Sequence, residues 1–188
     1  MSIILASASP RRTELLKLAK IKHLVESSQI EEILNPELSP AEQVRFLSKQ
    51  KAEAVSKKHP TKTVIGADTI VVFNNKILGK PVDKLDALQT LIQLSGNIHE
   101  VMTAVCFMNQ EKNICEFILD ITEVEFFETD VEWIENYVDN EEPLDKAGSY
   151  GIQGSGFELV KRINGDFYSV VGLPISKVKR VLNQFDLI

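Results

Sequence analysis

The sequence Ile-Leu-Ala-Ser-Ala-Ser-Pro-Arg-Arg-Thr-Glu-Leu-Leu, at residues 4–16, decides how this chain begins to fold. An apolar run leads through small polar residues to Pro10, after which apolar residues follow at helical spacing. Ser9 is a good N-cap and Pro10 a good first helical residue, because proline lacks the N–H that would be orphaned there. The stretch therefore predicts a strand, a tight loop and the start of a helix.

Two arginines, Arg11 and Arg12, lie in the first turn of this predicted helix, where the helix dipole favours acidic side chains. Free backbone amides, the positive end of the dipole and two guanidinium groups together favour an anion, above all phosphate. A helical projection at about 100° per residue turns both arginines toward the apolar stripe of Leu15 and Leu16. A pair of ordinary surface arginines is the alternative that position alone leaves open.

The composition limits the classes of protein to consider. The 188 residues are 44% hydrophobic, enough for one sizeable core or two lobes, and we expect a single domain over residues 1–188. The net charge of −6 argues against a general nucleic-acid or membrane binder, since such partners usually need a basic surface. No signal peptide and no apolar run of ~18 residues is evident. Cys106 and Cys115 match no metal spacing and are expected as free thiols in the cytoplasm.

A lysine lies on the inward face of the second predicted helix. Residues 39–42, Ser-Pro-Ala-Glu, form a capping box that starts a helix running to about Lys57. Lys51 projects onto the middle of the apolar face, whereas Lys49 falls on the other side. A lysine at such a place either extends to solvent along its stem or points into a cavity that holds an anion.

Two acidic sites flank this helix. Residues 63–73, Thr-Val-Ile-Gly-Ala-Asp-Thr-Ile-Val-Val-Phe, predict a buried strand in which Asp68 should face a polar pocket, a cation or a basic partner. Backbone amides at a bulge beside Gly66 are the alternative, although that glycine also leaves room for a ligand. Glu31 and Glu32 lie in a predicted loop, either as solvated charges or as a carboxylate that holds a divalent cation over phosphate.

Two later loops carry further candidates. Lys80, between a glycine and a proline, either binds phosphate or is solvated. Residues 142–156 are rich in glycine but match neither a dinucleotide fingerprint nor a Walker loop, because no helix pattern follows. Gln153 in this loop either reads a base edge through its paired donor and acceptor or remains solvated.

The rest of the chain predicts hairpins and helices, which gives a mixed α/β fold with more hairpins than a doubly wound sheet. The expected elements are strands 98–107 and 114–127, a helix opened by a capping box at residues 129–132, a hairpin of strands 157–163 and 167–171, and a final helix from Pro174 to about Phe185.

The polar candidates combine cations and hydroxyl donors with carboxylates, and they are Ser7, Arg11, Arg12, Lys51, Lys80, Asp68 and Glu32. Such a set suits a polyphosphate with a divalent cation. The carboxylates hold the metal or deprotonate a water, and the basic groups neutralise a leaving pyrophosphate. The three histidines form no Ser–His–Asp arrangement, and there is no zinc spacing.

Several motifs, in order and over nearly the whole chain, resemble the Maf family of nucleoside triphosphate pyrophosphatases. They are Leu-Ala-Ser-Ala-Ser-Pro-Arg-Arg at 5–12, Gly-Ala-Asp-Thr at 66–69, Leu-Gly-Lys-Pro at 78–81, Ser95-Gly96 with His99, Asp-Lys-Ala-Gly-Ser-Tyr-Gly-Ile-Gln-Gly at 145–154, and Gly-Leu-Pro at 172–174. Each motif alone is weak, but together they are highly specific.

The resemblance implies hydrolysis of a nucleoside triphosphate to the monophosphate and pyrophosphate, with Mg²⁺ or Mn²⁺ as cofactor. It implies a two-lobed α/β fold around a central cleft, similar to the inosine triphosphatase group, and a homodimer. Asp68 matches the family's proton acceptor. Positions linked to substrate choice are Arg11, Thr69 and Gln153. Further matching cleft residues are Ser7, Arg12, Glu32, Lys51 and Lys80.

The motif at 145–154 resembles the branch of the family that acts on dTTP and UTP, with modified pyrimidine triphosphates as further candidates for a house-cleaning role. Asp68 and Glu32 are the candidate metal ligands. One carboxylate does not easily serve both as metal ligand and as base, and the sequence does not choose for Asp68. The alternative function is a nucleotide-sensing regulator of septum formation that acts through a protein partner. The intact Asp68 and lysines argue against it.

Overall fold

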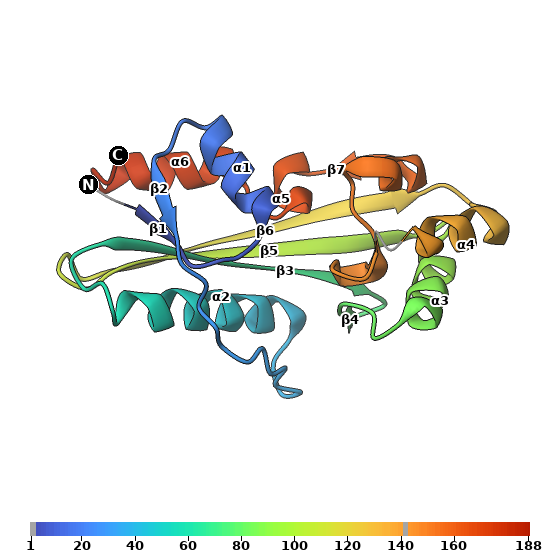
Figure 1. The fold of residues 1–188 in the computed structure, drawn as a ribbon, viewed down its shortest axis with the longest axis horizontal. Helices are drawn as coiled ribbons and strands as arrows, with labels where there is room; N and C mark the ends of the chain where they lie inside the picture. The colour runs from blue at the N-terminus through green and yellow to red at the C-terminus, as the bar shows by residue number, and fades with distance from the viewer. Residues whose placement is uncertain (1–2, 141–142) are drawn as a thin grey trace. The chain divides into compact units, whose positions relative to one another are not determined.

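The computed structural model describes residues 3–140 and 143–188, and these residues form an α/β fold built on one mixed sheet (Figure 1). The strand order is β2-β1-β3-β5-β6-β7, and β4 pairs with β3. The strands of this sheet are β1 (Ile3–Leu5), β2 (His23–Val25), β3 (Thr63–Phe73), β4 (Lys76–Leu78), β5 (Ile98–Asn109), β6 (Ile114–Phe126) and β7 (Val160–Asn164). The expected mixed α/β class is therefore confirmed.

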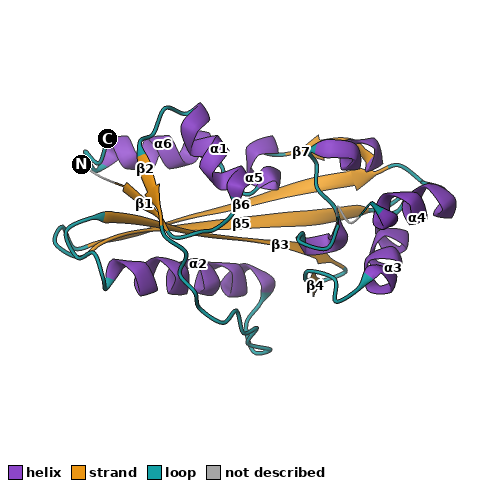
Figure 2. Cartoon of the chain, in the orientation of Figure 1, coloured by secondary structure: helices purple, strands orange, loops and turns teal. Residues whose placement is uncertain are grey.

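Helices precede or follow most strands, as Figure 2 shows. The α-helices are α1 (Pro10–Leu18), α2 (Pro40–Ser56), α3 (Lys84–Leu94), α4 (Val131–Asp139), α5 (Phe167–Val171) and α6 (Ile175–Gln184). Two 3₁₀ segments, η1 (Ala147–Ser149) and η2 (Gly154–Leu159), occupy the glycine-rich stretch, whose first residue, Glu142, lies outside the described residues. In the described part of the chain, no helix is long and apolar enough to cross a membrane.

Two parallel pairs lie at the β2 end of the sheet. Strand β1 pairs in parallel with β2 on one side and with β3 on the other, so that Ile4 lies opposite both Leu24 and Val64. Antiparallel pairs join β3 to β4 and β6 to β7. The β3–β4 turn, Asn74-Asn75, has positive φ at both residues, as a tight two-residue hairpin turn requires.

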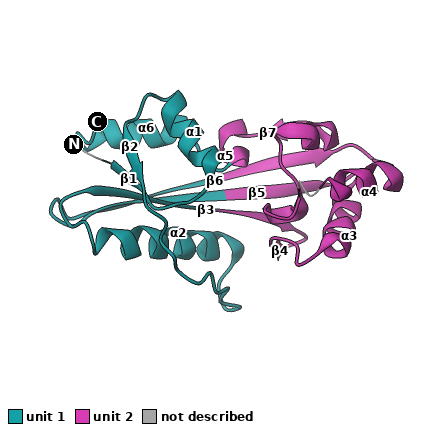
Figure 3. Ribbon diagram, in the orientation of Figure 1, with its two compact units in different colours: residues 1–68, 103–120, 172–188 teal, residues 69–102, 121–171 magenta. Residues whose placement is uncertain are grey.

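The chain divides into two compact units (Figure 3). Unit 1 comprises residues 1–68, 103–120 and 172–188, and unit 2 comprises residues 69–102 and 121–171. In unit 1, α2 covers one face of the strands, and α1 and α6 lie over the other face (Figure 1). Its core includes Ala52 and Val55 of α2 against Val64 and Cys106 of the sheet. Of the two thiols, both free, Cys106 is buried and Cys115 is exposed.

In unit 2, α3 and α4 pack side by side (Figure 1). Leu91 and Leu94 of α3 share one buried cluster with Ile134 of α4 and Phe126 of β6. The cluster also includes Tyr150, which lies between the two 3₁₀ segments. The glycine-rich stretch is thereby fixed to the interior of this unit.

The expected hairpin of strands 157–163 and 167–171 is wrong. Residues 154–159 form a 3₁₀ segment, and residues 167–171 form helix α5, which leaves only β7 as a strand. Asp166 explains the change, because its carboxylate accepts the Tyr168 amide at 2.9 Å and its carbonyl accepts the Ser169 amide at 3.0 Å. These bonds start a helix where a short apolar run alone does not distinguish helix from strand.

The capping box expected at residues 129–132 is also wrong. Helix α4 takes Asp130 as its N-cap, with no side-chain capping bond. The Thr129 hydroxyl instead donates to the carbonyl of Phe127 at 3.2 Å. By contrast, the capping box at the start of α2 is complete, with Ser39 and Glu42 bonded to each other's backbone amides.

Candidate active site

Lys51 lies between two carboxylates in unit 1. Its side chain extends from α2 and is only 9% exposed. The Lys51 Nζ lies 2.5 Å from Asp68 Oδ1 and 2.8 Å from Glu32 Oε1. Asp68 is buried, whereas the Glu32 side chain is 48% exposed. Of the surroundings expected for Asp68, the structure therefore shows the basic partner. It also confirms that the Lys51 side chain points inward from its helix.

Gly66 explains how α2 comes so close to β3. A Cβ at Gly66 would lie 2.3 Å from the carbonyl oxygen of Ser48 and 2.5 Å from the amide nitrogen of Ala52, both in the α2 backbone. Gly66 and Asp68 lie on the same face of β3, because side chains alternate along a strand. The helix backbone thus fills the space beside Gly66, and the expected room for a ligand there is wrong.

Arg12 is fixed by the loop before its helix and by the chain before α6. Its Nε donates to the carbonyl of Gly172 at 2.9 Å, and its Nη1 donates to Ser7 Oγ at 3.0 Å. Ser7 Oγ also accepts the backbone amide of Ser9 at 3.3 Å. Arg12 is buried, as the helical projection predicted, and Arg11 is half-buried. The Gly172 carbonyl was not predicted as a partner, although the motif at 172–174 marked the segment.

The charges in this part of unit 1 influence one another. Burial lowers the pKa of the Arg12 guanidinium from its ordinary value, and Arg11 lowers it further. The negative charges of Asp68 and Glu32 act in the opposite direction and favour the charged guanidinium. Three basic groups with two carboxylates leave a formal charge of +1 when all are ionised, which suits an anion.

The two carboxylates fit a divalent cation of the Mg²⁺ type. Oxygens of Asp68 and Glu32 lie within 2.8 Å of one nitrogen, so both groups can reach one position now held by the Lys51 ammonium. Mg²⁺ in nucleotide sites usually takes one or two carboxylates and completes its shell with water and phosphate oxygens. Among residues 3–140 and 143–188, no group of three or more His, Cys, Asp or Glu is placed to hold a metal.

The unit 2 candidates lie on β3 and on two loops. Thr69 is half-buried on β3, and Lys80 and Gln153 are exposed. The two loops are joined, since the backbone amide of Gly148 donates to the carbonyl of Gly79 at 3.0 Å. Gly148 has a φ of +68°, and a Cβ there would lie 2.7 Å from Val71, so this contact needs glycine.

Buried rings hold the same glycine-rich stretch. The Tyr150 hydroxyl lies 2.8 Å from His99 Nε2, and the rings of both pack edge-to-face on Phe126. The Tyr137 hydroxyl accepts the backbone amide of Gly151 at 3.2 Å. Burial lowers the pKa of His99 to about 4, so this imidazole is neutral near pH 7. Gln153 is thus an exposed residue that follows a segment held by buried contacts at Tyr150 and Gly151.

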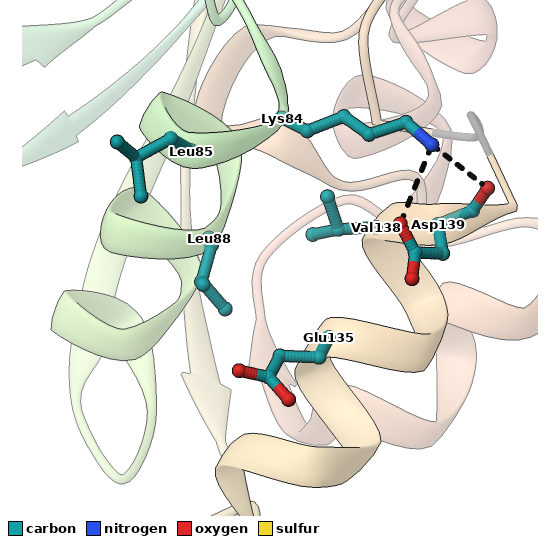
Figure 4. A pocket seen from close by; sticks show the side chains of 6 residues that line it. All are labelled: Lys84, Leu85, Leu88, Glu135, Val138 and Asp139. Carbon is teal, nitrogen blue, oxygen red and sulfur yellow. Dashed lines mark hydrogen bonds and ion pairs between the residues drawn. The ribbon is translucent and has the colours of Figure 1, made fainter.

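None of these candidates lines a pocket of about 210 Å³ in unit 2 (Figure 4). It lies between α3 and α4, and its lining residues are Lys84, Leu85, Leu88, Glu135, Val138 and Asp139. Its lysine already pairs with the carboxylate of Asp139 at 3.3 Å. Two carboxylates and a paired lysine make this pocket unfavourable for a triphosphate.

Residues 2–185 of the chain match the family described as Maf-like protein. The chain belongs to the Maf family. A protein of Bacillus cytotoxicus named dTTP/UTP pyrophosphatase is 51% identical over 183 residues, which are 97% of this chain and 95% of that protein. A protein of Bacillus velezensis with the same name is 49% identical over 185 residues, 98% of this chain and 97% of that protein.

Solved structures with a similar fold have little sequence in common with the chain. A HAM1 protein from Coxiella burnetii matches with a TM-score of 0.56 and 14% identity, over 98% of this chain and 99% of that one. The Ham1 protein of Staphylococcus aureus matches with a TM-score of 0.51 and 14% identity, over 85% and 80% of the two chains. These likenesses support the fold.

Proposed function

We propose that this protein is a nucleoside triphosphate pyrophosphatase that hydrolyses dTTP and UTP to the monophosphate and pyrophosphate. The observation that carries the proposal is the buried Lys51 between Asp68 and Glu32, next to the fixed guanidinium of Arg12. This arrangement occurs in a chain of the Maf family whose relatives, about half identical over nearly their full length, are named for that activity.

Asp68 is the proposed catalytic residue. As a buried carboxylate, it accepts a proton from the water that attacks the α-phosphorus. Lys51 holds one of its oxygens at 2.5 Å and so fixes the direction of the carboxylate before substrate arrives. The divalent cation, Mg²⁺ or Mn²⁺, would be held by Glu32, and by Asp68 as well only if Asp68 is not the base. When bound, that cation supplies neutralisation of the phosphate charge.

The cations of unit 1 bind the phosphates. Arg12 offers a preorganised positive charge, because hydrogen bonds to Ser7 and Gly172 fix its guanidinium group. Ser7 lies in the loop before the N-terminus of α1, where phosphate binding is favoured. Arg11 and Lys51 add charge that offsets the negative charge of the departing pyrophosphate.

Unit 2 supplies two of the three groups proposed to choose the nucleotide, and unit 1 supplies the third. Thr69 and Gln153, together with Arg11, are proposed to select the base, and Lys80 to bind phosphate. The exposure of Lys80 and Gln153 leaves both side chains accessible to a ligand. We further propose that the 188 residues act as one domain, as a homodimer and in the cytoplasm, and the central cleft between lobes stays a prediction.

Product analysis with a panel of nucleoside triphosphates and Mg²⁺ tests the proposal. Release of pyrophosphate and monophosphate from dTTP and UTP, with weak turnover of purine triphosphates, is the expected result. Release of inorganic phosphate and a diphosphate would contradict the reaction class. Tight nucleotide binding without turnover would instead favour a nucleotide-sensing regulator.

A further inference from the structure

Gln43 connects α2 to the loop that carries Glu32, and nothing in the function described above uses it. The residue is 1% exposed and lies near the N-terminal end of α2. Its Oε1 accepts the backbone amide of Asn35 at 2.8 Å, and its Nε2 donates to the carbonyl of Ile33 at 3.4 Å. A buried amide that uses its donor and its acceptor on one short loop acts as a clamp on that loop.

The side chains of the loop do not anchor it through burial. Residues 31–37 are all exposed, so no buried apolar side chain among them anchors the backbone. Asn35 adds a local turn, since its carbonyl accepts the Leu38 amide at 3.1 Å and its side chain accepts the Glu37 amide at 3.0 Å. This turn shapes the loop but does not attach it to the helix.

Two side chains of α2 attach it instead, at different heights along the helix. Gln43 holds the backbone at Ile33 and Asn35, and Lys51 holds the carboxylate of Glu32. Gln43 and Lys51 are eight positions apart, which corresponds to about 12 Å along a helix axis. Two attachments so far apart fix the direction of the loop as well as its distance from α2.

We propose that Gln43 is a positioning residue, which holds the loop so that the Glu32 carboxylate lies beside Lys51 and Asp68. The inference rests on the proposed function in one respect, the role of Glu32 toward a divalent cation. Gln43 itself touches neither substrate nor metal and acts through the backbone at residues 33–35. Loss of the clamp should therefore weaken the metal response and leave the maximal rate nearly unchanged.

The test compares Gln43→Met with Gln50→Met, the same substitution at a half-buried position of the same helix. A hydrogen bond contributes about 1 kcal/mol net, which corresponds to about fivefold. In metal-free Gln43→Met, the Asn35 amide should exchange its hydrogen about fivefold faster. The Mg²⁺ concentration for half-maximal pyrophosphate release should rise about fivefold, with kcat at saturating Mg²⁺ within twofold of the unmodified protein. Gln50→Met should change neither quantity.

A double-mutant cycle with Glu32→Gln shows whether Gln43 acts through Glu32. The effect of Gln43→Met on the Mg²⁺ response should disappear when Glu32 is already replaced. An effect that persists, or an unchanged Asn35 exchange rate, overturns the inference. Gln43→Leu, with thermal unfolding as the check on folding, provides a second variant for the same measurements.

Failure of the proposed function gives a different pattern from failure of the clamp. Absence of pyrophosphate release from the unmodified protein, or a normal Mg²⁺ response in Glu32→Gln, overturns the role of Glu32 and with it the positioning role of Gln43. Hydrogen exchange at Asn35 needs neither metal nor turnover, so it still reports the clamp. An unchanged exchange rate together with normal turnover overturns the positioning role alone.

Discussion

In unit 1, Arg12, Lys51 and Asp68 are each less than 10% exposed and are bonded to other protein groups, whereas Lys80 and Gln153 of unit 2 are exposed. Buried, internally bonded charges have a fixed direction before substrate binds, which is what stabilisation of a reacting phosphate requires. Exposed side chains on loops adapt more readily and suit discrimination among nucleotides. The difference predicts that substitutions of these buried charges in unit 1 change rate and stability, and that substitutions of these exposed loop residues in unit 2 change substrate preference.

Replacement of Asp68 by asparagine should have the largest effect. Asparagine keeps the shape but cannot accept a proton, so kcat should fall at least ~10²-fold if Asp68 is the general base. The measurement is pyrophosphate release from dTTP across Mg²⁺ concentrations. A large rise in the Mg²⁺ requirement with a nearly normal kcat would assign Asp68 to the metal instead.

Asp120→Asn is the matched control for this variant. Asp120 is also buried and also pairs with a lysine, Lys177 of α6. It should lower stability and leave kcat within about twofold of normal, since a buried pair broken on one side costs stability. A loss of kcat equal to that of Asp68→Asn would attribute both effects to folding.

Lys51→Met should destabilise the metal-free protein by about 2 kcal/mol. Breaking a buried ion pair costs about 3–5 kcal/mol, and the exposure of Glu32 reduces the penalty here. The variant is destabilised because Asp68 and Glu32 lose the ammonium group between them. Added Mg²⁺ should therefore restore part of the lost free energy of unfolding. Chemical denaturation with and without Mg²⁺ measures both values.

Lys49→Met provides the control, because Lys49 lies exposed on the same helix. Its free energy of unfolding should stay within about 0.5 kcal/mol of normal, as is usual for surface substitutions. If Lys49→Met and Lys51→Met were equally destabilised, the pairing of Lys51 with Asp68 and Glu32 would contribute nothing specific.

The interior of unit 2 should make stability depend on pH through His99. Burial lowers its pKa from 6.5 to about 4, so the unfolded chain binds the proton more readily than the folded one. The contribution of the neutral imidazole to stability is complete above pH 6.5 and is lost as the pH falls toward 4. At pH 5 the loss is about 2 kcal/mol from this shift.

His99→Gln should remove most of this pH dependence, because glutamine has no proton to take up in this range. Its side chain still offers a donor and an acceptor to the Tyr150 hydroxyl. Denaturation at pH 5 and pH 7 gives the slope for both proteins. An equal slope in the variant would show that other groups cause the dependence.

The sequence predicts much of unit 1 because its signals there are local. The β-branched run at residues 63–73 matches β3 residue for residue, and the capping box at Ser39 starts α2 as expected. Helical periodicity also gives the inward direction of Lys51. It does not give the identity of the groups that Lys51 meets, because those come from β3 and from the loop at Glu32.

Other features depend on contacts that no periodicity encodes. Gly66 looks like space for a ligand until the α2 backbone is placed against it. The Gly172 carbonyl is 160 residues from Arg12 in the sequence, and only folding brings them together. Residues 167–171 have an apolar run too short to separate helix from strand, and the Asp166 carboxylate decides for helix α5.

Gln153→Ala should have the smallest effect and the most selective one. Loss of one exposed amide contact to a base should change the ratio of kcat/KM between dTTP and another triphosphate by about fivefold. The free energy of unfolding should not change, because Gln153 is exposed and the segment before it is held by Tyr150 and Gly151. Gln93→Ala, at an exposed site on α3, is the control. If Gln153→Ala lowered kcat for all nucleotides alike, an exposed loop residue of unit 2 would contribute to the chemistry itself. The contrast between the buried charges of unit 1, which set the rate, and the exposed loop residues of unit 2, which set substrate preference, would then be wrong.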